Sequence, residues 1–496
     1  MASNNIPDTN QRGSFGSNLG FLLSAVGSAV GLGNIWGFPF KMGKSGGFTF
    51  LLIYLLLAVF VGFVIMLGEL ALGRKTGYGP VNAYKAVSKK FKWVGWLAII
   101  APFLIMTFYS VLGGYCIYYI AINIGGLFGT MPDGSSFEYI RTTPLVAIGV
   151  MVLFMVICWI INRNGVDGGI EKFNEIGMPA LFIMLIIIIV KALTMEGAVE
   201  GLKFMFKPGY AVEGGFIAKE AAPNALQVLS TAAGQMFFSL SLAMGAMITY
   251  GSYLSKKESL PKNSVLIVIA DTLVALMAGI AVIPASVANG MAQHMSNAEI
   301  AGGLGGPGLL FVTLQNVFHD MGKLGGVFGI IFFLLVLIAA VSSAISLVEA
   351  VSVTFIDRAS AKGKEPNRNR TVTIVCVIIT ALACLVAADG LGKNGIEPNV
   401  FFGLNLENPP DVWADWLDFM DTWSESIIMP LGALFMSLMI GWELKPKFFK
   451  DEIDQGGNAS NGLMAFWGFC MKFVVPIVMI LVLVYMVSNS FGLGWI

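Results

Sequence analysis

Long runs of apolar residues, separated by short polar segments, repeat along the whole chain. Each run has about 20 residues or more, which is enough for an α-helix to cross the hydrocarbon core of a bilayer. The pattern predicts an all-α polytopic membrane protein with about 11 transmembrane helices. The expected spans are residues 16–39, 47–72, 95–125, 144–162, 173–194, 226–254, 263–288, 325–357, 371–390, 413–442 and 463–488.

Composition supports a membrane protein and excludes other classes. Of the 496 residues, 56% are hydrophobic and 12% are charged, about half the charged fraction of a soluble domain. The formal net charge is zero, so no nucleic-acid partner is expected. His294 and His319 are isolated and show no metal-ligand spacing. The sequence shows neither a nucleotide-binding loop nor a nucleophile constellation, so we do not expect an enzyme.

Lysine and arginine predict the orientation. They gather in alternate loops, at residues 74–92, 256–262, 358–370 and 445–450. Cytoplasmic loops carry the excess of positive charge. The N-terminus, with a polar tail over residues 1–15, is therefore expected in the cytoplasm, and an odd number of spans places the C-terminus outside.

Two spans are interrupted by residues that weaken helices. GSAVGLGNIWGFPF (27–40) lies in the first span and FFSLSLAMGAMITYGSY (237–253) in the sixth. Interruptions at corresponding places in two halves indicate an inverted-repeat transporter. This predicts a first repeat at 16–194, a second at 226–442 with outer-loop helices around 294–320, and one extra helix at 463–488.

A broken helix inside the membrane frees polar backbone groups, which must meet a partner or line a cavity. Freed carbonyls suit Na⁺, and the N-terminus of a half-helix suits a carboxylate. The two breaks therefore predict a mid-membrane site for an amino acid and its driving ion. The alternative is that the glycines only allow close helix packing.

Three strings carry a resemblance to a known family. GSAVGLGNIWGFP, GELALGR (68–74) and GQMFFSLSLAMGAMITYGSY (234–253) resemble the neurotransmitter:sodium symporter family, in its bacterial, leucine-transporter-like branch. The resemblance covers nearly the whole chain in order. It implies a 5+5 inverted repeat that imports a neutral, hydrophobic L-amino acid with sodium by alternating access. It also implies two Na⁺ sites, no organic cofactor, and a monomer or weak dimer in a bacterial cell membrane.

The resemblance implies the ligands of both sodium sites. The second site would use oxygens of Gly27, Val30, Ala339, Ser342 and Ser343, and the first site those of Ala29, Asn34, Ser239 and Asp271. For the two helix-8 serines the alternative is a hydrogen bond to their own helix.

Asp271 departs from the family pattern. The leucine transporter has asparagine at this position, and chloride-dependent members have a serine where this chain has Ala275. A carboxylate buried in a membrane is costly unless it is paired. We therefore expect Asp271 to be ionised beside Na⁺ and transport to be chloride-independent; the alternative is a protonated, structural aspartic acid.

The substrate site follows from the same resemblance. Backbone amides near Gly31 to Gly33, the first Na⁺ and the Tyr109 hydroxyl would hold a carboxylate, and Gly31 favours amino acids over monoamines. The apolar lining favours a neutral, hydrophobic side chain. The residues expected around the substrate are Ser28, Ala29, Gly31, Gly33, Ile105, Tyr109, Phe238, Ser239, Ser241, Met244, Ser343 and Leu347.

The cytoplasmic gate resembles the family's ion pair. Arg12 and Asp357 occupy the matching positions, with Ser252 and Tyr253 nearby. Phe15 stands where tryptophan is usual.

The outer gate departs from the family. NIWGFP replaces NIWRFP, so Gly37 removes the family's arginine while its partner, Asp421, remains. Lys41 lies four residues on and is expected to pair with Asp421. The alternative is that Lys41 snorkels to the outer interface.

Two further buried carboxylates bear on the mechanism. Glu69 is expected to support the unwound backbone of the sixth span, and Glu349 is either water-facing or protonated. One rival function is a proton-coupled carrier that titrates Glu349 or Asp271. Another is an amino-acid-binding sensor or channel without coupled transport.

Overall fold

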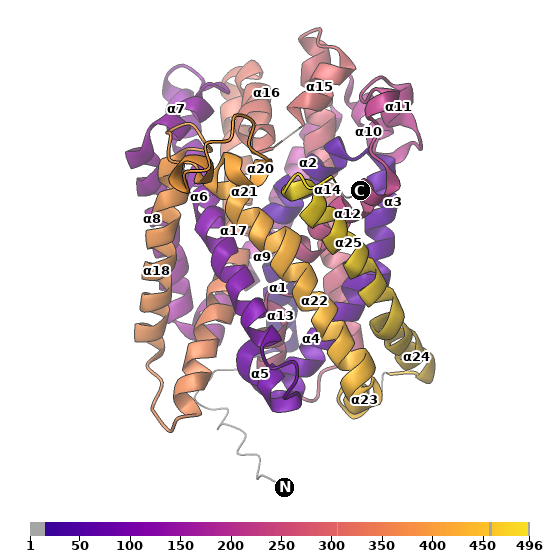
Figure 1. Ribbon diagram of the computed structural model, residues 1–496. Coiled ribbons are helices and arrows are strands. Elements are labelled where there is room, and N and C mark those ends of the chain that lie inside the picture. The colour runs from indigo at the N-terminus through magenta and orange to yellow at the C-terminus, as the bar shows by residue number, and fades with distance from the viewer. Residues whose placement is uncertain (1–14, 305, 456–458, 495–496) are drawn as a thin grey trace.

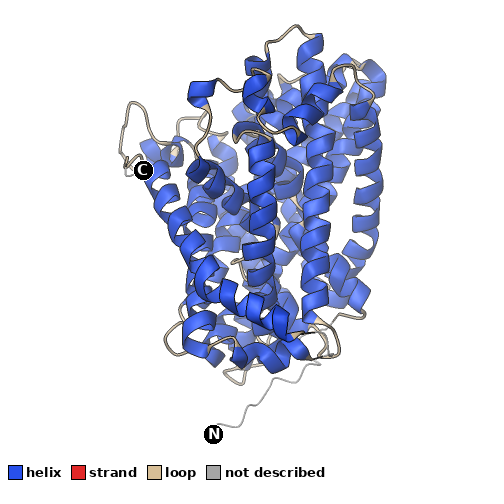
Figure 2. Cartoon of the chain, turned by 90° about the vertical axis from the view of Figure 1, so that its right-hand side faces the viewer, coloured by secondary structure: helices blue, strands red, loops and turns tan. Residues whose placement is uncertain are grey.

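The computed structural model describes residues 15–304, 306–455 and 459–494, and within them the chain is a bundle of helices without strands (Figures 1 and 2). Arg12 lies outside these residues. The helices run roughly parallel through the bundle and short helices and loops cover both ends. This confirms the predicted all-α membrane architecture.

Nine helices of the described ranges are long and apolar enough to cross a membrane. They are Phe48–Thr76 (α3 to α4), Val94–Phe128 (α6), Pro144–Arg163 (α8), Val166–Leu193 (η4 and α9), Leu260–Ala292 (α14), Gly322–Ser360 (α17), Arg368–Asp389 (α18), Trp416–Leu444 (α21 to η8) and Asn461–Ser490 (α24 to α25).

The first and sixth predicted spans are both broken. In the first, α1 (Asn18–Ala29) and the helical stretch Gly33–Lys44 are bent by 47°. In the sixth, α12 (Ala225–Ser239) and α13 (Ala246–Tyr253) are separated by residues 240–245. With the bent first span, the described residues contain up to ten helices long and apolar enough to cross a membrane, which is close to the predicted number of about 11. The division into two repeats remains a prediction.

The two breaks have different backbones. In the first span only residues 30–32 separate α1 from η2, a π-helical turn at Gly33–Gly37. In the sixth, Ser241, Ala243 and Gly245 all have positive φ angles, of 52°, 58° and 71°. The left-handed conformation costs a residue with a Cβ about 1–2 kcal/mol. Surrounding hydrogen bonds must therefore hold this loop open.

Glycines bring the second half of the sixth span, α13, against α4 (Phe63–Thr76). A Cβ on Gly73 would lie 1.9 Å from the Ile248 carbonyl oxygen, and one on Gly251 would lie 2.5 Å from the Leu70 carbonyl oxygen. Neither distance is possible for a real side chain. The backbones of α4 and α13 are therefore in direct contact.

Short helices cap the bundle. At one end lie α7 (Ser136–Thr142), α10 (Ala198–Phe206), α15 (Asn297–Gly303) and α16 (Leu314–Asp320) (Figure 1). At the other end, near the N-terminus, lie α5 (Pro80–Val87) and α23 (Lys447–Asp454).

A buried ion pair links α4 to α23 at that second end. Arg74 Nε lies 2.7 Å from Glu452 Oε1, and the two side chains are 1% and 4% exposed. Arg74 also donates to the Glu258 carbonyl oxygen. Removing one partner of a buried pair leaves the other charge uncompensated, which costs about 3–5 kcal/mol.

Arg74→Ala should therefore lower the thermal unfolding temperature of the detergent-purified protein by many degrees. Lys203→Ala is the matched control, because its 2.7 Å pair with Glu200 is solvent-accessible and worth at most about 1 kcal/mol. Equal shifts for the two variants would contradict a structural role for the Arg74 pair.

Candidate functional site

A small cavity lies where the two broken spans meet, with an empty volume of about 250 Å³. Helices α1, α6, α12 and α17 contribute to its wall. Its lining consists of Ala29, Gly31, Gly33, Ile105, Tyr109, Phe238, Ser241, Met244, Ser343 and Leu347. These are ten of the twelve residues that the sequence placed around a substrate.

The other two, Ser28 and Ser239, turn their hydroxyls elsewhere. The Ser28 hydroxyl donates to Ser346 Oγ at 2.7 Å, while the Ser28 carbonyl accepts from Ser241 Oγ at 2.7 Å and from Ser343 Oγ at 3.0 Å. The Ser239 hydroxyl bonds the Asp271 carboxylate instead. Ser28 therefore faces the site with its backbone.

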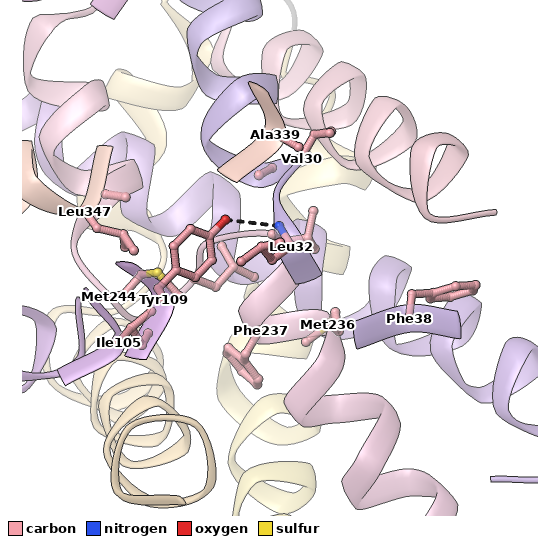
Figure 3. Packing of buried hydrophobic residues seen from close by; sticks show 14 of the residues in the cluster. Val30, Leu32, Phe38, Ile105, Tyr109, Met236, Phe237, Met244, Ala339 and Leu347 are labelled. Carbon is pink, nitrogen blue, oxygen red and sulfur yellow. Dashed lines mark hydrogen bonds between the residues drawn. The ribbon is translucent and has the colours of Figure 1, made fainter. Parts of the chain in front are cut away.

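One end of the cavity is polar because α1 unwinds there. The Leu32 backbone N–H donates to the Tyr109 hydroxyl oxygen at 3.0 Å (Figure 3). A Cβ on Gly31 would lie 2.3 Å from Ser343 Oγ and 2.6 Å from the Tyr109 oxygen. Any side chain at position 31 would displace both oxygens, and that of an aspartate would fill the space beside them.

The other end is apolar. Ile105, Met244 and Leu347 group around the Tyr109 ring in Figure 3, and the Phe238 ring centroid lies 6.3 Å from that of Tyr109. None of the lining residues carries a charge. A charged ligand side chain would have no partner here, whereas an apolar one would be well accommodated.

Oxygen atoms converge on one side of this cavity, between α1 and α17. Ser342 Oγ lies 3.3 Å from the Val30 carbonyl oxygen and 2.9 Å from that of Ala339. Ser343 Oγ lies 3.4 Å from the Gly27 carbonyl oxygen. Ser342 thus bonds its own helix and also reaches across to α1. All five oxygens expected for the second sodium site are gathered, and such a neutral set suits a hard monovalent cation.

A second polar cluster surrounds Asp271, whose side chain is fully buried. Its carboxylate accepts from Asn34 Nδ2 at 2.7 Å, from Ser239 Oγ at 3.0 Å and from the Tyr54 hydroxyl at 3.4 Å. Asn34 Oδ1 in turn accepts from the Gly31 backbone N–H at 2.9 Å. Three of the residues expected at the first sodium site are therefore in contact, and the fourth, Ala29, lines the adjacent cavity.

Sequence reasoning missed Tyr54. Its hydroxyl lies in the apolar run FLLIYLLL, residues 50–57. A lone polar group in such a run requires a buried hydrogen-bond partner, so the sequence could have indicated that Tyr54 contacts a polar residue. The partner is the Asp271 carboxylate.

Glu69 supports the break in the sixth span, as expected. Its Oε1 accepts from the Ala243 backbone N–H at 2.8 Å. This bond stabilises Ala243 in its left-handed conformation. Glu69 Oε2 is buried and has no hydrogen-bond partner within the described ranges.

Glu349 is not water-facing, so that alternative is wrong. It is fully buried and forms an ion pair with Arg368, with Nη2 and Oε2 2.6 Å apart. The Tyr253 hydroxyl donates to its other oxygen at 2.7 Å. Arg368 belongs to the basic segment 358–370, which the sequence analysis used only to predict the membrane orientation and not as a source of a partner for Glu349.

Aromatic contacts and hydrogen bonds hold the start of α1. Phe15 packs edge-on against Phe21 and Tyr250, with centroids 5.4 and 5.5 Å apart. Glu171 Oε2 accepts from the Gly16 backbone N–H at 2.8 Å; Glu171 was missed from sequence. The expected partner of Arg12, Asp357, accepts from the Gly79 N–H at 2.7 Å.

The expected direct pairing of Lys41 with Asp421 is wrong. Lys41 forms its salt bridge with Glu425, and the two side chains are 17% and 8% exposed. Asp421 lies close enough to interact electrostatically with both. The reason is local: Thr422–Ile428 (η7) is π-helical, so side chains beyond Asp421 do not follow the α-helical spacing.

Gln235 occupies the place next to Gly37. A Cβ on Gly37 would lie 2.7 Å from Gln235 Oε1, and Gln235 Nε2 donates to the Gly33 carbonyl oxygen at 2.7 Å. The amide therefore covers this turn of the first span.

Comparison with known proteins agrees with this geometry. The model of the sodium:neurotransmitter symporter family matches residues 12–127 and 143–397, well over half of the chain. The chain belongs to the sodium:neurotransmitter symporter family. Members of this family are membrane transporters that use sodium, and not enzymes.

Relatives within the sodium:neurotransmitter symporter family cover almost the full length. A sodium-dependent transporter of Bacillus subtilis, YhdH, is 30% identical over 479 residues, covering 95% of this chain and 97% of its own. A sodium-dependent transporter of Haemophilus influenzae is 29% identical over 507 residues, with 99% and 100% coverage. The crystal structure of MhsT in complex with L-phenylalanine aligns with a TM-score of 0.80, at 35% identity over 96% of this chain and 100% of MhsT.

Proposed function

We propose that this protein imports a neutral, hydrophobic L-amino acid together with sodium by alternating access. The observation that carries the proposal is the cavity itself. It offers backbone groups and a tyrosine hydroxyl at one end, apolar side chains at the other, and oxygen clusters beside it. The similarity to MhsT, which was crystallised with L-phenylalanine, supports this substrate class.

Each part of the substrate has a partner of the right chemistry. The backbone around Gly31 and the Tyr109 hydroxyl receive the carboxylate, aided by Na⁺ at the first site. The Ser241 hydroxyl and the Phe238 carbonyl receive the ammonium group. Met244 and Leu347 contact the side chain.

Sodium and substrate couple because both use the same unwound segment of α1. Na⁺ between α1 and α17 fixes the carbonyls of Gly27 and Val30, and Na⁺ beside Asp271 adjoins the substrate carboxylate. Each ligand then raises the affinity of the other by the same factor. The ionised Asp271 supplies the negative charge, so chloride is not required.

The same proposal includes the location. The N-terminus lies in the cytoplasm and the C-terminus outside a bacterial cell membrane, because the basic loops lie at the end of the bundle near the N-terminus. The lipid bilayer and the small-molecule substrate are the only partners required, and the protein works as a monomer or weak dimer.

A thermal-shift screen of the twenty amino acids, with and without sodium, tests the substrate class. A ligand at 100 times its Kd stabilises the folded state by about 2.7 kcal/mol. Hydrophobic amino acids should raise the unfolding temperature only when sodium is present. Preference for charged amino acids, or equal shifts in potassium, would refute the proposal.

Proteoliposome uptake separates the rival functions. Accumulation of labelled substrate against its gradient, driven by sodium, excludes a sensor or channel. Uptake driven by a pH gradient at zero sodium would instead establish a proton-coupled carrier.

The outer gate provides a further prediction. Glu425→Gln should weaken substrate binding roughly tenfold, because Lys41 loses a partly buried partner worth about 1–2 kcal/mol. Asp421→Asn should weaken it less. Isothermal titration in saturating sodium measures both.

A double-mutant cycle assigns the pair. Lys41→Ala combined with Glu425→Gln should cost little more than either change alone. If the losses of substrate affinity are additive for Lys41 and Glu425 but strongly coupled for Lys41 and Asp421, the pairing expected from the sequence is correct instead.

A further inference from the structure

A groove lies between α8 and α18, on the side of the bundle away from the substrate cavity. The two helices lie side by side at the left edge of Figure 1 and pack against each other. The groove is open along one side and has a volume of about 410 Å³. This is the size of a site for a sizeable organic ligand.

The lining forms one straight stripe on each helix. It runs from Val152 to Trp159 on α8 and from Thr373 to Ala381 on α18, and its residues recur at helical spacings of three and four. Each stripe therefore rises about 10–12 Å along its helix. The groove is parallel to the spans, which is the direction of acyl chains in a bilayer, and its wall is almost entirely apolar.

Both stripes end in an arginine at the same end of the bundle. Arg163 follows Trp159 by four residues, and its guanidinium carbon lies 4.7 Å from the Trp159 ring centroid. Arg370 precedes Thr373 by three residues. The Trp159 Nε1–H donates to Thr373 Oγ1 at 2.9 Å and joins the two helices at this end.

Both arginines are exposed, and neither forms an ion pair with another described residue. Arg368, between them, is different because it pairs with the buried Glu349. Two arginines without an ion-pair partner among the described residues therefore lie at one end of the apolar groove. That arrangement complements a molecule with an anionic head and a hydrocarbon tail.

We propose that this groove is a binding site for one anionic phospholipid of the leaflet nearest the N-terminus. Its phosphate contacts Arg163 and Arg370, and one acyl chain lies along the two stripes. Arginine suits this head group because its planar donors match phosphate oxygens. The site is independent of the proposed transport activity, and it needs only that the bundle lies in a membrane.

Native mass spectrometry of the full chain, released from mixed micelles of phosphatidylglycerol and phosphatidylcholine with identical acyl chains, tests this proposal. The wild-type protein should retain phosphatidylglycerol in preference. The double variant Arg163→Gln/Arg370→Gln should lose about 30-fold of that preference, because each cation near the lipid surface contributes about fivefold.

Arg358→Gln is the matched control. Arg358 also stacks on a tryptophan, Trp96, at 5.8 Å, but it does not adjoin the groove, and its loss should leave the preference unchanged. An equal loss in this control would show a diffuse charge effect and overturn the proposal.

Blocking the groove tests the acyl chain separately. Ala381→Trp should lower the retention of both lipids, and Ala381→Val is the smaller change to use if the first variant does not fold. Glycerol phosphate, which has no acyl chain, should not compete with the lipids for the groove. Unchanged lipid retention in the folded variants would refute the proposal. A change in dimer fraction alone would assign the groove to a second copy of the chain instead.

Discussion

Replacing Asp271 with asparagine should raise the sodium concentration for half-maximal uptake about 100-fold or more. The carboxylate is fully buried and has Asn34, Ser239 and Tyr54 around it. Removing one member of a buried charge pair costs about 3 kcal/mol or more, which corresponds to about two orders of magnitude in affinity. Sodium-dependent uptake into proteoliposomes gives the value.

Asp133→Asn is the control for charge alone, since Asp133 is exposed in a loop, and it should leave sodium activation unchanged. A sodium titration of thermal stability in the absence of substrate separates binding from turnover.

In the wild-type protein, gluconate in place of chloride should leave uptake intact. Collapse of uptake under that exchange would refute the role assigned to the carboxylate.

Replacing Gly31 with alanine should lower the affinity for the amino acid about 30- to 100-fold. The new Cβ would lie within 3 Å of Ser343 Oγ and the Tyr109 oxygen, so both oxygens must move away from the unwound backbone. Overpacking of this kind costs about 1–3 kcal/mol. Equilibrium binding of labelled substrate in saturating sodium measures the loss.

Gly149→Ala is the matched control for this prediction. Gly149 lies on α8, and a Cβ there meets no other atom within 4 Å. Binding by this variant should equal that of the wild type. Full binding by the Gly31 variant would show that the carboxylate is held elsewhere.

The sequence pattern was sufficient to locate the broken helices, whereas the residues of the cavity were expected from the family resemblance. Apolar run length predicts spans because the bilayer sets helix length, and clustered glycines at 27–40 marked the first break. Ser241 and Ala243 were harder to foresee as left-handed residues, because neither is glycine. Their conformation depends on tertiary contacts, such as the bond from Ala243 N–H to Glu69.

Side-chain pairing between distant spans could not be predicted equally well. The partner of Lys41 was misassigned because η2 and η7 are π-helical, and a spacing rule for α-helices fails there. The partner of Glu349 was missed because Arg368 lies on the next helix, α18, and single-sequence patterns contain no information on contacts between helices. Only the packed structure brings these charges together.

The glycine contacts between α4 and α13 also bear on how the molecule changes shape. Backbones that touch at Gly73 and Gly251 leave no side-chain layer that can slide or repack. A displacement of α13 must therefore carry α4 with it. The start of α1 contacts its neighbours through side chains instead, and the described contacts include the Glu171 carboxylate, the Asn18–Asn263 hydrogen bond and the Phe15 ring edges. The two half-helices beside the cavity are thus attached differently, α13 by backbone contact with α4 and the start of α1 by side chains.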